Sequence, residues 1–192
     1  MIMKIAAGGV VALALLGAAP IAMAESQSPG TSQGTTAPSR QSMSSATDQS
    51  FIKTAIEGNL AEIAMGKLAQ EKGKDDDVKE LGRDLVEDHT KANEKAMKLA
   101  QTAGITAPTE PNAEQKKAHE ELSKLSGDAF DRQFAQVMIK EHKQAIQAYT
   151  AAAEGDGPVA DYADEVLPDL RDHLEDAEEI AKELASKKRS EK

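Results

Sequence analysis

An all-α fold is predicted by three observations on this sequence. From residue 47 onward, apolar residues recur at helical spacing through four long stretches, with glycine or proline residues between them. No stretch alternates polar and apolar residues over the length of a strand, and there is no Asn-Gly hairpin signal. Aromatic residues make up only 3% of the chain, so the core must consist of small and aliphatic side chains, which suit closely packed helices.

Two long helices joined by a tight turn are predicted in the first half of the domain. Apolar spacing predicts one helix over 48–72, which Gly73 ends, and a second over 75–103, which Gly104 ends. The second helix opens with three consecutive aspartates, which favour the positive end of a helix dipole. The two helices are therefore expected to form an antiparallel hairpin.

A second hairpin is predicted from two further helical stretches. They cover about 129–154 and 158–186, and the turn Gly155-Asp-Gly-Pro158 separates them. Pro168 lies inside the last stretch and is expected to kink or break it near Leu167, because proline lacks the amide proton that a helix needs.

The segment between the hairpins decides the topology. It runs from Gly104 to Gly127 and contains two prolines and a short predicted helix over 112–125. A connection of this length can run along the whole bundle, so the third long helix can begin at the opposite end from where the second finishes. The prediction is a ferritin-like four-helix bundle, made of two helical hairpins joined by a long crossover with a short helix.

Residues 1–24 have the features of a secretory signal peptide. One lysine precedes a run of apolar and small residues, and Ala22-Met-Ala24 has the small-x-small form of a cleavage site. The alternative, a transmembrane anchor, is disfavoured because the stretch is short and contains Gly17 and Pro20. The protein is therefore expected to be exported, either periplasmic or associated with the outer membrane, with no transmembrane segment after cleavage.

Composition divides the rest of the chain into three parts. Residues 25–46 are rich in Ser, Thr, Gln, Gly and Pro, which cannot bury enough apolar surface to fold, so a disordered low-complexity linker is predicted. Residues 47–187 are predicted to form the helical domain, and residues 188–192 a charged tail.

Charge and composition exclude several kinds of function. The formal net charge of −10 argues against nucleic acid and anionic membrane surfaces as partners. The chain has no cysteine, which excludes disulfides, thiolate metal ligands and a cysteine nucleophile. No glycine-rich phosphate loop and no nucleophile-elbow serine occur, so no catalytic or organic-cofactor-binding residue is predicted and an enzyme is disfavoured.

Each long helix carries a metal-capable residue on its apolar face, where buried unpaired charges are normally excluded. At a rise of about 1.5 Å per residue, these residues fall near the middle of helices about 40 Å long. They are Glu62, His89, Glu141 and His173. His142 falls at the edge of its stripe, and since neighbours cannot both point inward, Glu141 is expected to be the better placed of the two. His119 lies in a charged run of the crossover and is expected to be solvated.

Five pieces of the sequence carry a resemblance to a known family: Phe51-Ile-Lys-Thr-Ala, Gly58-Asn-Leu-Ala-Glu62, Asp88-His89 with Asn93, Gly127-Asp-Ala-Phe-Asp131 leading to His142, and Leu167-Pro168 leading to His173. In these pieces the chain resembles an exported bacterial ferritin-like family of unknown function, whose members are often labelled outer-membrane or periplasmic proteins. The likeness spans about residues 50–184, and it implies a ferritin-like four-helix fold without an established activity.

The sequence departs from the di-iron form of this bundle, which needs one Glu from each of two helices and Glu-x-x-His from the other two. Val86 and Leu170 stand where the paired glutamates would lie, so a ferritin-type oxidation centre is disfavoured. The remaining set of two histidines and two carboxylates suits a single divalent Zn, Fe, Mn or Cu ion. The alternative is a metal-free cluster in which buried His and Glu side chains hydrogen-bond each other across the bundle.

Two functions therefore stay open. The first is a non-enzymatic envelope protein with a structural, protective or partner-binding role, its partner being another envelope protein or a second copy of the chain. The second is a mononuclear metal-binding protein that stores or buffers an ion or uses it in redox protection. Metal analysis of protein purified without a chelator separates them.

Overall fold

The computed structural model describes the backbone of residues 45–190 and the side chains of residues 45–187. The predicted signal peptide and nearly all of the predicted linker lie outside this range. The described residues form five helices and no strand, as the sequence predicts, and none of these helices is apolar enough over a sufficient length to cross a membrane. The helices are α1 (Ala46–Lys72), α2 (Asp76–Ala103), α3 (Ala113–Ser123), α4 (Gly127–Ala153) and α5 (Pro158–Ser190).

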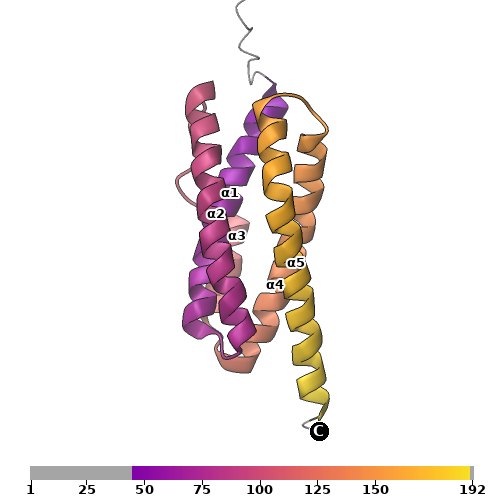
Figure 1. The fold of residues 1–192 in the computed structure, drawn as a ribbon. Helices are drawn as coiled ribbons and strands as arrows, with labels where there is room; N and C mark the ends of the chain where they lie inside the picture. The colour runs from indigo at the N-terminus through magenta and orange to yellow at the C-terminus, as the bar shows by residue number, and fades with distance from the viewer. Residues whose placement is uncertain (1–44, 191–192) are drawn as a thin grey trace, which may run out of the picture. The chain divides into compact units, whose positions relative to one another are not determined.

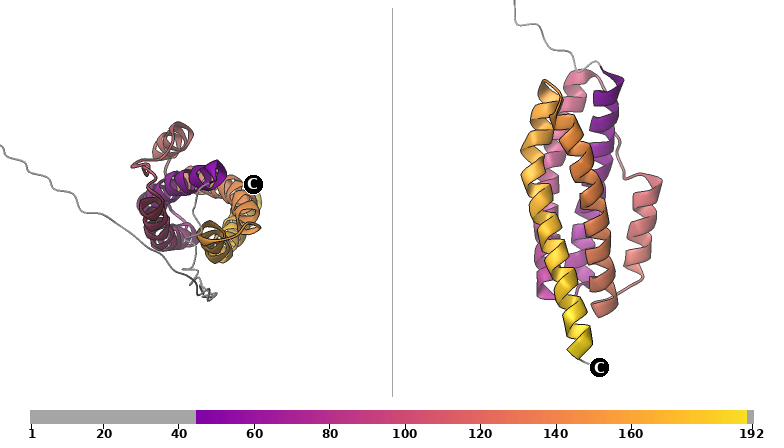
Figure 2. Two further views of the ribbon diagram at one scale, coloured as in Figure 1. Left: turned by 90° about the horizontal axis from the view of Figure 1, so that it is seen from above. Right: turned by 90° about the vertical axis from the view of Figure 1, so that its right-hand side faces the viewer.

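The four long helices pack side by side as two antiparallel hairpins. α1 pairs with α2 and α4 with α5, while α2 also contacts α5 and α1 contacts α4 (Figure 1). α2 ends at the opposite end of the bundle from the start of α4, so the connection between them crosses its length. The short helix α3 lies on this connection, outside the four long helices and against α1 and α4 (Figure 2).

Side-chain caps fix where three of the helices begin. The Ser45 hydroxyl accepts a hydrogen bond from the Asp48 amide at the start of α1, and the Asp75 carboxylate accepts one from Asp77 at the start of α2. Asn112 and Gln115 form a reciprocal capping box on α3. Because α1 begins at Ala46, the last predicted linker residue belongs to the first helix.

Pro168 does not break α5, contrary to one of the two outcomes expected from the sequence. The helix runs without interruption from Pro158 to Ser190. The amide that proline lacks would have bonded to the carbonyl of Asp164, one turn earlier. Both Pro168 and Asp164 are exposed, so this carbonyl lies on the solvent side of the helix, where water can satisfy it.

Two glycines allow α1 and α2 to approach closely. A Cβ atom built on Gly66 would lie 2.5 Å from the carbonyl oxygen of Gly82, and one built on Gly82 would lie 2.8 Å from the Cβ of Ala69. Gln70 joins the helices at the same place, since its Nε2 donates to the carbonyl oxygens of Gly66 and Gly82 at 3.4 and 3.2 Å. The first hairpin is thus held by backbone contact as well as by side-chain packing.

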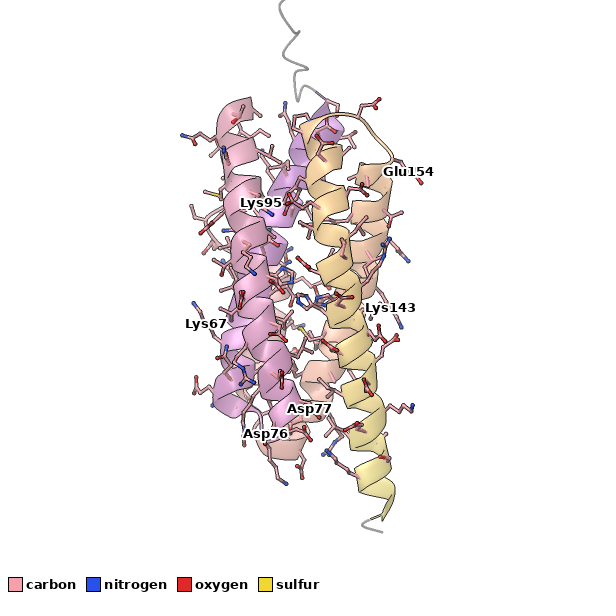
Figure 3. All side chains as sticks on the ribbon, in the orientation of Figure 1. Lys67, Asp76, Asp77, Lys95, Lys143 and Glu154 are labelled. Atoms are coloured by element: carbon pink, nitrogen blue, oxygen red, sulfur yellow. The ribbon has the colours of Figure 1, made fainter. Side chains whose placement is uncertain are left out.

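The apolar core is divided into two clusters by a layer of buried polar side chains. On α1, Ile56 belongs to one cluster and Met65 to the other, with Glu62 between them. The other three long helices change from one cluster to the other in the same way, each at a histidine, so all four changes lie at one level. The polar layer consists of Asn59, Glu62, His89, His142 and His173. Charged side chains such as Lys67 and Lys143 lie on the outside of the helices (Figure 3).

Candidate metal centre

Three histidines from three different helices meet in the polar layer. His89 on α2, His142 on α4 and His173 on α5 are 5%, 1% and 3% exposed. Their ring centroids lie 5.4 to 5.9 Å apart, and one nitrogen of each ring lies within 4.8 Å of a nitrogen of each of the others. Burying three polar imidazole rings this close together costs free energy unless their nitrogens find partners.

The outward-facing nitrogens of two of these rings face groups that only accept hydrogen bonds. Nδ1 of His142 lies 3.0 Å from the backbone carbonyl oxygen of Met138. Nε2 of His173 lies 3.4 Å from Oδ2 of Asp88. A carbonyl or carboxylate oxygen at these positions draws the ring proton to the nitrogen that it faces. The opposite nitrogens, Nε2 of His142 and Nδ1 of His173, are then left without a proton.

His89 is oriented by a chain of polar side chains. Its Nδ1 lies 3.0 Å from Oδ1 of Asn59, whose Nδ2 donates to the hydroxyl of Tyr162 at 3.2 Å. The hydroxyls of Tyr162 and Tyr149 are hydrogen-bonded to each other at 3.2 Å. Since the Asn59 amide nitrogen donates to Tyr162, its oxygen faces His89 and accepts a hydrogen bond from the Nδ1–H group, and Nε2 of His89 is left as a free acceptor.

In the neutral rings, three nitrogens of this cluster carry no proton. Nε2 of His89, Nε2 of His142 and Nδ1 of His173 are all buried and have no hydrogen-bond partner within the described residues. Their lone pairs cannot satisfy each other, because each is an acceptor. They match the donor set of a metal ion, and outer groups that fix the ring tautomer are usual around metal-bound histidine.

Burial keeps two of the rings in the neutral form that binds a metal. Desolvation, with repulsion from His142 and His173, holds the pKa of His89 well below its usual value of 6.5. Desolvation and then His173 lower the pKa of His142 to about 4. Both rings are thus uncharged at neutral pH, so a cation need not displace protons from them.

Glu62 is the best candidate for a fourth ligand, because its carboxyl group is buried and has an oxygen without a partner. Its side chain is 8% exposed, and its Oε2 is buried without a hydrogen-bond partner. Burial, and to a lesser extent the neighbouring Glu141, raises the pKa of Glu62 from 4.5 to about 8. Such a carboxyl is neutral in the absence of a positive charge and becomes a strong ligand when a cation is bound beside it.

The expected order of Glu141 and His142 is reversed. His142 is the inner residue, whereas Glu141 is half-buried at the edge of the helix. The large buried side chains of α4 show why, since Phe134, Met138 and His142 follow one another at four-residue spacing along one face. In the sequence-based prediction, alanines such as Ala148 counted as apolar although they are exposed, which shifted the predicted centre of the apolar face toward Glu141. Weighting the stripe by side-chain size would have placed His142 correctly.

A pocket of about 330 Å³ leads from the surface to this cluster. It lies between α1 and α4, beside the start of α3, and its inner end is formed by Glu62, His89 and His142. Glu114 and Glu141 line it nearer the surface, and no lysine or arginine contributes to its lining. Leu170, which replaces a glutamate of the di-iron pattern, is among its apolar walls.

Three supporting residues were not among the site residues predicted from the sequence. Asn59 and Asp88 hold the outer nitrogens of His89 and His173, and Asp131 accepts hydrogen bonds from the amides of Lys74 and Asp75 at 3.0 Å each. The available signal for Asn59 was a polar residue on an apolar stripe, and the signal for Asp88 and Asp131 was their place in the segments that resemble the family. His119 lies on α3, outside the cluster.

The fold and the site define an all-helical domain with a buried three-histidine cluster. Residues 33–180 match the model of a family described as "Domain of unknown function (DUF4142)", and the chain belongs to this family. A search of curated proteins found no match. This match supports the prediction from the sequence that the chain belongs to a family of unknown function.

Several solved structures have a similar fold. A DUF305 fragment from Deinococcus radiodurans has a TM-score of 0.65 at 14% identity, covering 72% of this chain and 97% of that one. A protein described as "putative secreted protein DUF305 from Streptomyces coelicolor" has a TM-score of 0.63 at 12% identity, covering 72% and 92%. "CopM in the Cu(II)-bound form" has a TM-score of 0.58 at 18% identity, covering 71% and 96%. At these identities the likeness establishes the fold.

Proposed function

We propose that this protein binds one divalent metal ion through His89, His142 and His173, with the Glu62 carboxylate as the fourth ligand. The observation that carries the proposal is that His89, His142 and His173 each bury a ring nitrogen without a hydrogen-bond partner, and that the three rings can offer nitrogens within 4.8 Å of one another. A buried polar atom left unsatisfied costs about 1–3 kcal/mol, so three together need compensation that an ion would supply. Glu141, outside this set, is not among the proposed ligands.

The donor set favours copper, with zinc as the alternative. Three imidazole nitrogens and one carboxylate oxygen suit Cu(II) or Zn(II), and among divalent ions such sites bind Cu(II) most tightly. The absence of cysteine removes the thiolates that would favour Cu(I). Copper is also the metal named for CopM, which has a similar fold.

A storage or buffering role fits this arrangement better than redox catalysis with two metals. The site has one cluster of nitrogens and lacks the bridging carboxylates at Val86 and Leu170 that a di-iron centre needs. The single crossover between the two hairpins supports a ferritin-like topology for the bundle. The signal-like residues 1–24 and the secreted structural relative support an exported protein, so the ion would be bound outside the cytoplasm.

Metal binding can be measured directly. Protein purified without a chelator, and chelator-treated protein titrated with Cu(II) or Zn(II), should bind close to one equivalent. A His89→Ala/His142→Ala variant should lose this site, whereas His119→Ala removes a histidine outside the cluster and should keep it.

The metal-free alternative predicts a different result in the same experiment. If the polar layer only sets the register of the bundle, the wild type binds no ion even after titration, and chelator leaves its melting temperature unchanged. In that case the structural or partner-binding role in the envelope becomes the better description.

A further inference from the structure

The pocket beside the histidine cluster has the charge pattern of a path for a cation. Three carboxyl groups line it, from Glu114 and Glu141 near the surface to Glu62 at its inner end, and no lysine or arginine is among its lining residues. Glu114 is ion-paired with Lys140 at 3.3 Å, so Glu141 and Glu62 carry the argument. The inner end holds buried atoms without partners, namely Oε2 of Glu62 and Nε2 of His89 and His142, so the pocket joins solvent to three of the four proposed ligands. It is called the access pocket below.

We infer that the access pocket is the route by which a hydrated divalent cation reaches the histidine cluster, and that the Glu141 carboxylate attracts the ion on its way in. This inference rests on the proposed function. Glu141 is half-buried at the pocket lining and is one residue from His142, so it can attract the ion without belonging to the final ligand set. The ion then passes to Glu62, which is buried at the inner end beside His89 and His142.

The opposite face of the bundle is a poorer route. A groove between α2 and α5 is also acidic, but none of the proposed ligands lines it. On that side His173 faces Asp88 through its protonated nitrogen, so a cation arriving there would meet an N–H group and no lone pair. The acidic residues of that groove are Asp77, Glu80, Asp84, Asp176, Glu179 and Glu183.

Gly58 keeps the access pocket wide. It lies on α1 in the pocket lining, and a Cβ atom added there would have Nε2 of Gln115, at 4.0 Å, as its nearest neighbour. A methyl group therefore fits without a clash, while a larger side chain would project into the open space. This position offers a substitution that narrows the pocket and a matched one that does not.

The rates of metal binding test the route. The chain has two tyrosines and no tryptophan, and Tyr149 lines the access pocket, so quenching of tyrosine fluorescence by Cu(II) reports arrival of the ion. In stopped-flow mixing, Gly58→Leu should slow association and chelator-driven dissociation by the same factor, with Kd unchanged. Gly58→Ala should leave both rates as in the wild type. Should Gly58→Leu not fold, Ala148→Phe, which substitutes an exposed residue of the pocket lining, serves instead.

The charge of Glu141 is tested separately. Glu141→Gln should lower the association rate about sevenfold at low salt, the effect of removing one unit charge about 7 Å from the path of a divalent ion in water. The difference should shrink above 0.1 M salt, where the screening length falls below about 10 Å. Glu179→Gln, which removes the same charge from the opposite groove, should leave the rate nearly unchanged.

Each outcome decides the matter. Unchanged rates in Gly58→Leu, or equal slowing in Glu179→Gln and Glu141→Gln, would overturn the access route while leaving metal binding intact. Faster dissociation with weakened affinity in Glu141→Gln would make Glu141 a ligand rather than a carboxylate on the path. A wild type that binds no Cu(II) would overturn the proposed function itself, and this inference with it.

Discussion

A single amide, that of Asn59, connects His89 in the buried polar layer to Tyr162 outside it. Its oxygen faces Nδ1 of His89, and its nitrogen donates to the hydroxyl of Tyr162 on α5. The two contacts use both ends of the side chain, so the ring of His89 has only one favourable orientation. A residue that touches no ion can therefore control whether the cluster binds one.

Replacing Asn59 with Ala should weaken metal binding more than it weakens the fold. Loss of an outer hydrogen bond to a metal-bound histidine typically lowers affinity about 10- to 100-fold. Competition with a chelator of known affinity measures this change. Tyr162→Phe is the matched control, because it removes only the hydroxyl that holds the far end of Asn59, and its effect should be smaller. Equal affinity in Asn59→Ala and wild type would mean that the ring of His89 is held by packing alone.

The carboxyl group of Glu62 gives the metal-free protein a pH dependence. Its pKa is about 8 in the folded protein and near 4.5 when exposed, so the folded state holds a proton that the unfolded state loses between these values. The contribution of the neutral carboxyl is thus complete below pH 4.5 and is lost as the pH rises toward 8.

Glu62→Gln removes this titration and keeps a neutral side chain of similar shape. In chelator, the stability of the wild type relative to Glu62→Gln should fall steadily between pH 4.5 and 8. Urea unfolding at several pH values measures the difference. If the free energies of unfolding of the two proteins change with pH in parallel, burial does not raise the pKa of Glu62. His142, with a lowered pKa, acts in the opposite direction below pH 6.5, and is common to both proteins.

At the scale of the helix, the close approach of α1 and α2 depends on Gly66. Gly66→Ala should destabilise the protein, because the new methyl group would lie against the carbonyl oxygen of Gly82. Alanine favours a helix over glycine by about 1 kcal/mol, so a net loss would show that helix contact outweighs propensity. Overpacking of this kind costs about 1–3 kcal/mol. Denaturant unfolding measures the change.

Gly58→Ala provides the comparison on the same helix. Position 58 has room for a methyl group, so the propensity term should act alone and the stability should rise by up to about 1 kcal/mol. If both substitutions stabilise the protein, α1 and α2 can move apart at Gly66 without loss of stability, and their close contact is not required.

The helices were predictable from the sequence because their signals are local. Apolar spacing and glycine stops placed the ends of the long helices within a few residues, and the acidic first turn of α2 and the short helix on the connection were predicted correctly. The effect of Pro168 was overstated, because the sequence alone does not show that the carbonyl affected faces solvent. Local patterns also identified the polar residues on the inner faces.

The site was less predictable because its contacts join distant parts of the chain. Asn59 and Tyr162 are 103 residues apart, and the Asp131 contacts with Lys74 and Asp75 span 57 and 56 residues. Glu141 and His142 are neighbours on α4, so which of them points inward depends on how the helix is rotated about its axis. An average over small alanines cannot resolve a rotation of that size, whereas the large buried side chains of α4 do.

For the molecule as a whole, Asp131 ties the two hairpins together at the end of the bundle where α4 begins. Its two carboxylate oxygens accept the amides of Lys74 and Asp75 in the turn between α1 and α2, and the residue is 1% exposed. Asp131→Ala should cost about 2 kcal/mol or more, because two amides lose a charged acceptor. Thermal unfolding should show one cooperative transition at lower temperature. A change below about 0.5 kcal/mol would indicate that water replaces the carboxylate without loss.

The histidines of the cluster lie more than thirty residues apart along the chain and come from both sides of the connection 104–126. An extended chain therefore has no pair of neighbouring ligands with which to capture an ion early. The proposed ion can be taken up only after both hairpins have docked. If the site binds an ion as proposed, the metal that it acquires would then depend on the ions present in the compartment where folding is completed, and not on those present where the chain is synthesised.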